Sequence, residues 1–152
     1  MKANIRILTL AVALCAALAL PAIAQEKHDH KHKATPKGGR LLDKTEPHAE
    51  FVVEKDRTVT INFYNEGMKP VAASTQTVTA IADAKSGKAT IQFEKKGDSL
   101  VSKTKLPDGE GYNVVVQFRQ AADAKPQNFR FKLETHECGG CKRAEYSCTC
   151  DE

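Results

Sequence analysis

Short segments in which hydrophobic and polar residues alternate dominate the chain between about residues 38 and 133. In "RTVTINFY" the valine, isoleucine and phenylalanine fall on one face, and threonines and an asparagine fall on the other. The same period of two recurs in "TVTAIAD", "KATIQFEK", "YNVVVQFR" and "NFRFKL". A strand with this period buries one face of a sheet and exposes the other. The pattern predicts a core that contains Val59, Ile61, Phe63, Val114, Val116, Phe118, Phe129 and Phe131.

The breaks between these segments have the composition of turns. "YNEGMKP", "AKSGKA", "KKGDS" and "PDGEG" each place glycine near asparagine, aspartate, serine or another turn-forming residue. No stretch of eleven or more residues shows a helical period. About seven regularly spaced strands predict an all-β fold, a single Greek-key or immunoglobulin-like β-sandwich.

The N-terminus has the pattern of a secretory signal peptide. Lys2 and Arg6 precede an apolar run over residues 7–20, and Pro21 is followed by an Ala-x-Ala site that ends at Ala24. The run is shorter than the roughly 20 apolar residues that a membrane-spanning helix needs, which disfavours a transmembrane anchor. We expect cleavage after residue 24, export to the periplasm or the medium, and membrane contact only during export.

Cleavage changes the composition of the mature chain. It removes both basic residues of the signal, so the formal net charge falls from +4 by two, and it also removes Cys15, which lies inside the apolar run. A charge so near zero gives no electrostatic case for nucleic-acid binding. The expected organisation is a signal peptide (1–24), a disordered histidine-rich arm (25–37), the β-sandwich (38–133) and a cysteine-rich tail (134–152).

The tail reads "HECGGCKRAEYSCTC" and contains the remaining four cysteines with C-x2-C and C-x-C spacing. Four thiolates can close a tetrahedral site around Zn(II), and the same soft ligands suit Cu(I). Two structural disulfides are the alternative, since thiols oxidise outside the cytoplasm. Bridges within each pair would close small, strained rings, so cross-pairing between the pairs is easier. A redox role remains a third interpretation. The candidate ligands are Cys138, Cys141, Cys148 and Cys150, with His136 as a substitute.

A second group of potential ligands lies in the arm, where "HDHKH" places His28, His30 and His32 at alternate positions. An extended arm could direct two or three imidazoles at one ion, although a solvated polar arm has the same composition. Two ligand clusters in one small exported chain strengthen the metal hypothesis. His48, at the entry to a predicted strand, is interpreted as a packed or half-exposed residue.

The segment "GGRLL…PHAEFVVEKDRTVTINFY…KPV", residues 38–71, resembles the opening module of periplasmic adaptor subunits of heavy-metal efflux systems. That module often starts with His-Gly-Gly, whereas here Lys37 stands before the two glycines. The chain also lacks the long helical hairpin of a full adaptor. The resemblance covers about a quarter of the chain, and it implies a small β-domain with an accessory role in heavy-metal homeostasis, with an efflux component as a partner.

Two functions are compatible with these features, and a third, an enzyme, is disfavoured. The first is a periplasmic protein that binds zinc or copper through its tail, with the arm as a low-affinity collector. The second is a non-catalytic interaction module with a disulfide-knotted tail and no metal. An enzyme is disfavoured, because the sequence contains no Ser/His/Asp set, nucleophile elbow or phosphate-binding loop.

Overall fold

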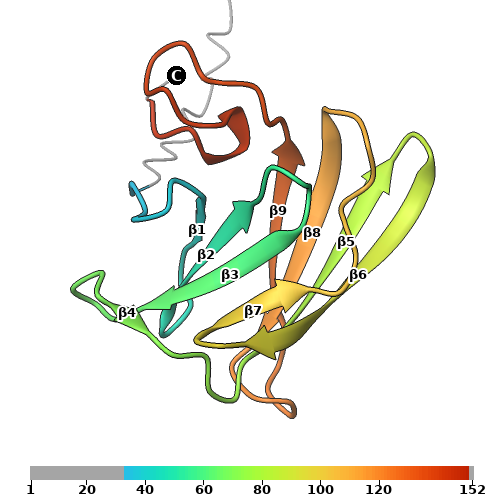
Figure 1. The fold of residues 1–152 in the computed structure, drawn as a ribbon. Helices are drawn as coiled ribbons and strands as arrows, with labels where there is room; N and C mark the ends of the chain where they lie inside the picture. The colour runs from blue at the N-terminus through green and yellow to red at the C-terminus, as the bar shows by residue number, and fades with distance from the viewer. Residues whose placement is uncertain (1–32, 151–152) are drawn as a thin grey trace, which may run out of the picture.

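The computed structural model describes residues 33–150, and Figure 1 shows their arrangement. Nine strands and one short 3-10 helix make up the regular structure of this part of the chain. The predicted signal peptide and the histidines of the predicted arm lie outside the described residues. The strands are β1 (Arg40–Leu42), β2 (His48–Val53), β3 (Val59–Tyr64), β4 (Pro70–Val71), β5 (Thr77–Ala84), β6 (Gly87–Lys96), β7 (Ser99–Ser102), β8 (Tyr112–Arg119) and β9 (Gln127–Leu133), and the helix is η1 (Glu145–Ser147).

The strands hydrogen-bond in the order β1-β2-β3-β7-β6-β5-β8-β9, with β4 added beside β3, and all the pairs are antiparallel. Strand β6 joins the two halves of the sheet, since residues 87–92 pair with β5 and residues 93–96 pair with β7. The result is a nearly closed antiparallel sheet. The predicted all-β class is confirmed. The finer expectation of a seven-stranded Greek-key sandwich is not confirmed as such, because the strands form one continuous order.

The core lies inside this folded sheet and follows the predicted alternation. Seven of the eight predicted core residues are buried, and the exception is Phe129, which is only partly buried. Strand β9 is the last strand of the order, so Phe129 has a hydrogen-bonded neighbour on one side only. Burial of large apolar side chains, worth about 1.5–3 kcal/mol each, is the main favourable contribution to the stability of such a domain.

The core continues beyond β9 into the tail, here defined as residues 134–150. Tyr146 of η1 is buried, stacks on Phe131 of β9 at 6.2 Å between ring centroids, and meets Phe51 of β2 edge-on at 6.4 Å. Its hydroxyl oxygen accepts a hydrogen bond from the backbone N–H of Val53 at 3.0 Å. Tyr146 therefore packs the tail against the domain.

The tail lies beside both edge strands, β1 and β9, of the nearly closed sheet (Figure 1). The carbonyl of Tyr146 accepts a hydrogen bond from Arg40 of β1 at 2.9 Å, and its N–H donates to the carbonyl of Glu134, just after β9, at 2.9 Å. Strands β1 and β9 are the first and last of the sheet order. The tail thus connects the edges that the strands themselves leave apart.

Candidate metal centre

The tail folds into two short loops that carry the four cysteines. In the first loop the N–H of Cys138 donates to the carbonyl of Arg143 at 2.7 Å, and the N–H of Lys142 donates back to the carbonyl of Cys138 at 3.2 Å. Lys142 has a φ of 59°, a left-handed conformation that turns the chain sharply after Cys141. Glu137 and Ala144 form an isolated antiparallel bridge at the base of the loop. These contacts direct Cys138 and Cys141 toward the same point.

The second loop follows the 3-10 helix. The N–H of Cys148 donates to the carbonyl of Glu145 at 3.0 Å, which ends the helix at the first cysteine of the C-x-C pair. The N–H of Cys150 then lies 3.4 Å from the sulfur of Cys148. A backbone N–H directed at sulfur favours the thiolate form of that sulfur.

The four cysteine sulfurs, which we term the cysteine centre, lie within 4.8 Å of one another. The sulfur of Cys138 is 3.1 Å from that of Cys148 and 3.8 Å from that of Cys150, and the sulfur of Cys141 is 3.6 Å from that of Cys148. A regular tetrahedron with Zn–S bonds of about 2.3 Å has sulfurs about 3.8 Å apart. The spacing therefore fits one ion at the middle of the four sulfurs, after small side-chain adjustments. None of the four cysteines is in a disulfide.

The thiols differ in their affinity for protons. Hydrogen bonds from the backbone N–H groups of Thr149 and Arg143 lower the pKa of Cys141 to about 6. The hydrogen bond with Cys138 is the largest of the contacts that raise the pKa of Cys148 to about 12. Cys141 therefore gives up its proton more readily than Cys148 does. Metal ligands must be deprotonated, so a metal that enters has to displace the proton of Cys148.

The remaining sequence-predicted ligands are not part of this cluster. His136 is exposed, and the group of potential metal ligands found in residues 33–150 contains the four cysteines without it. Its backbone carbonyl instead accepts a hydrogen bond from Glu145, so it helps to shape the tail. His28, His30 and His32 lie outside the described residues.

Two features of the centre were not apparent from the sequence. The first is the close approach of Gly140 to Cys150. The second is a loop, residues 35–40, that contacts the tail and that we term the anchor loop. Ser147 Oγ donates to the carbonyl of Gly38 at 2.8 Å, and Arg143 Nη2 donates to the carbonyl of Thr35 at 3.3 Å. The two glycines after Lys37 were a visible signal of an unusual backbone, but not of its partners.

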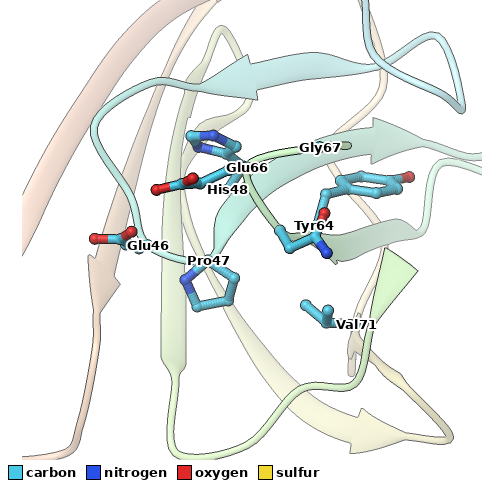
Figure 2. A pocket seen from close by; sticks show the side chains of 8 residues that line it. Glu46, Pro47, His48, Tyr64, Glu66, Gly67 and Val71 are labelled. Atoms are coloured by element: carbon cyan, nitrogen blue, oxygen red, sulfur yellow. The ribbon is translucent and has the colours of Figure 1, made fainter. Parts of the chain in front are cut away.

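Two hollows lie near the sheet. The larger, of about 520 Å³, is formed by the ends of β2 and β3 and the loops beside them, and Figure 2 shows His48, Glu46, Glu66 and Tyr64 around it. His48 Nδ1 lies 3.2 Å from the carbonyl of Thr45, which fits its interpretation as a structural residue. The smaller hollow, of about 350 Å³, runs between the tail and β2. Neither contains a cysteine.

Comparisons with protein-family models, curated proteins and solved structures found no match to this chain. Among the described residues, no helix is both long and apolar enough to cross a membrane. The chemistry of the cysteine centre is therefore the basis for a function.

Proposed function

We propose that this chain is an exported protein that binds one soft metal ion, Zn(II) or Cu(I), at the cysteine centre. The observation that carries the proposal is the convergence of four sulfurs within 4.8 Å on loops held by backbone hydrogen bonds. Four thiolates are a preferred ligand set for Zn(II), and thiolates also select Cu(I). The four-sulfur geometry favours a four-coordinate ion, hence Zn(II) before Cu(I).

The exposure of the cysteines suits a metal ion that is passed to or taken from other ligands. Cys150 is exposed and Cys141 is half-buried, whereas Cys138 is buried beneath them. A competing ligand can therefore approach the ion from the side of Cys150 without unfolding the domain. This favours transfer or buffering of the metal over a purely structural role.

The histidine arm has a role in this proposal as a low-affinity collector. The arm joins the domain at the anchor loop, where Thr35 contacts Arg143, two residues beyond Cys141. His32 precedes Thr35 by only three residues in the sequence. A tether this short raises the local concentration of imidazoles near the sulfurs.

The wider role that we propose is accessory: periplasmic heavy-metal homeostasis, with an efflux component as the partner and without catalysis. The support is the resemblance of residues 38–71 to the opening module of efflux adaptors, together with the signal-peptide pattern. The β-domain then serves as a rigid support that presents the cysteine centre.

The deciding experiment is native mass spectrometry of reduced mature protein, residues 25–152, titrated anaerobically with Zn(II) or Cu(I). We expect one tightly bound ion per chain. A Cys138→Ser/Cys141→Ser variant should lose it. Equal stoichiometry and affinity in the two proteins would contradict the proposal.

A second candidate function, a metal-free interaction module with a disulfide-linked tail, is favoured by the 3.1 Å separation of the Cys138 and Cys148 sulfurs. Glutathione disulfide would accept two electrons and two protons from these thiols, giving one protein disulfide and two glutathione molecules. Thiol alkylation of periplasmic protein before and after chelation separates the two functions. Thiols that become reactive only after chelation indicate metal, and thiols unreactive in both samples but reactive after reduction indicate disulfides.

A further inference from the structure

Glu50 of β2 has a buried carboxylate, although the alternation along the strand predicts that this face is exposed to solvent. Ala49 and Phe51 on either side of it point into the core, yet Glu50 is itself 0% exposed. The anchor loop crosses this face of the strand and covers the carboxylate. The approach is so close that a side chain at Gly39 would collide with the backbone of Phe51.

The carboxylate of Glu50 binds the anchor loop by its backbone. Its Oε1 accepts hydrogen bonds from the N–H of Gly39 at 2.7 Å and of Lys37 at 3.1 Å. Its Oε2 accepts a hydrogen bond from the hydroxyl of Tyr64 at 2.6 Å. A buried carboxylate is costly unless hydrogen bonds compensate it, and here three donors do so.

The anchor loop also forms hydrogen bonds to the tail beside each of the two cysteine pairs. The carbonyl of Gly38, between the two N–H donors, accepts from Ser147, which directly precedes Cys148. The carbonyl of Thr35 accepts from Arg143, which follows Cys141 by two residues. Ser147 is 2% exposed, so its hydrogen bond is shielded from water. More than 90 residues separate Glu50 from these tail positions, and the loop is the physical connection between them.

We propose that Glu50 is a positioning residue for the metal centre: its buried carboxylate fixes the anchor loop, and the loop fixes the relative position of the two cysteine pairs. This inference rests on the proposed metal-binding function. Residues that orient metal ligands without binding the ion typically change metal affinity by about 10- to 100-fold when they are lost, and Glu50 orients the ligands through the anchor loop.

Glu50→Gln is the sharpest variant, because it keeps the size of the side chain and removes one acceptor. The amide oxygen can still accept from Lys37 and Gly39 while the NH2 group faces the Tyr64 hydroxyl, but hydrogen bonds to a neutral amide are roughly half as strong as those to a carboxylate. The loop should therefore be held less firmly. Glu94→Gln is the matched control, since Glu94 is exposed on β6, far along the sheet order from β2. It makes the same change of charge without touching the loop.

The experiment measures Co(II) and Zn(II) affinity by chelator competition on reduced residues 25–152, with the thiolate-to-Co(II) absorption bands as a record of ligand geometry. We expect Glu50→Gln to bind about 10- to 100-fold more weakly with altered bands, and Glu94→Gln to match the wild type. Ser147→Ala, which removes the hydroxyl that contacts the carbonyls of Gly38 and Ala144, should weaken binding in the same direction, and it serves as the test if Glu50→Gln does not fold.

The outcomes separate this inference from the proposed function. Wild-type affinity and spectra in a folded Glu50→Gln protein would overturn the inference alone, as would wild-type affinity in Ser147→Ala if Glu50→Gln is unfolded. A lower unfolding temperature with unchanged affinity and bands would mark a merely structural role and would also overturn it. Absence of metal binding by the wild-type chain would overturn both.

Discussion

Gly140 lies directly against Cys150: a Cβ atom added to Gly140 would lie 2.6 Å from the sulfur of Cys150. A real Cβ does not approach sulfur so closely, so one of the two residues would have to move. The adjacent Gly139 has open space in the corresponding position. The two glycines of the C-x2-C loop therefore have different roles, although the sequence presents them as equivalent.

This difference gives a matched pair of variants. Gly140→Ala should displace Cys150 and weaken metal binding by at least about tenfold, equivalent to about 1.4 kcal/mol. Gly139→Ala should bind with nearly wild-type affinity. Chelator competition with Zn(II) measures both. Equal affinities in the two variants would show that Cys150 is not needed as a ligand.

Tyr146 provides a test of how the tail is attached to the sheet. Tyr146→Phe keeps the ring between Phe51 and Phe131 but leaves the N–H of Val53 without its partner. A buried donor without a partner costs about 1–3 kcal/mol, and we expect the lower end because Val53 is half-buried. Urea unfolding of the metal-free protein measures the difference. Tyr146→Ala should cost more, about 3–5 kcal/mol, since it also leaves a cavity.

The alternation predicted the strands β3, β5, β6, β8 and β9 and most of the core, because a period of two follows directly from the pleat of a strand. The sequence also predicted the four cysteines as one group, since the C-x2-C and C-x-C spacings restrict where the sulfurs can lie. It did not predict the burial of Glu50. Alternation places that residue on the solvent face, and only the anchor loop, brought there by the tertiary fold, covers it.

The local sequence pattern also did not predict that the tail connects the two edge strands of the sheet. The alternation ends at Leu133, which suggested a domain boundary there. The contacts of Tyr146 with Arg40 and Phe51 join positions that are about 100 residues apart in the chain. Sequence spacing contains no information about such pairs.

Removal of the tail tests this boundary directly. We expect a chain that ends at Glu134 to keep a cooperative β-fold, because nearly the whole apolar core precedes that residue. It should nevertheless lose at least as much stability as Tyr146→Ala, about 3–5 kcal/mol, since Phe51 and Phe131 lose the same ring. Circular dichroism and urea unfolding provide the readout. Non-cooperative unfolding of the truncated chain would make the tail an obligatory part of the fold.

The histidine arm makes a separate prediction. A His28→Ala/His30→Ala/His32→Ala variant should keep the tight equivalent of Zn(II) at the cysteine centre and lose any weaker second equivalent. It should also load the centre more slowly at low metal concentration, because the tethered imidazoles no longer gather the ion. Isothermal titration and stopped-flow measurements report the two effects. A Lys27→Ala/Lys31→Ala/Lys33→Ala variant controls for the composition of the arm, and equal loading rates in all three proteins would remove the collector role.

Metal binding should also stabilise the whole domain, because the cysteine centre is built on the segment that connects β1 and β9. An ion that binds only the folded state adds about 4 kcal/mol at a free concentration 1,000 times its dissociation constant. Zn(II) should therefore raise the urea midpoint of the reduced wild-type protein, and a chelator should reverse the change. Mg(II), which prefers oxygen ligands, should have no effect. Cys138→Ser/Cys141→Ser should respond to neither ion. If the Zn(II)-induced shift persists in this variant, the stabilising ion binds somewhere other than the four sulfurs. If the wild-type protein binds Zn(II) without any shift of the urea midpoint, the tail does not hold the sheet closed.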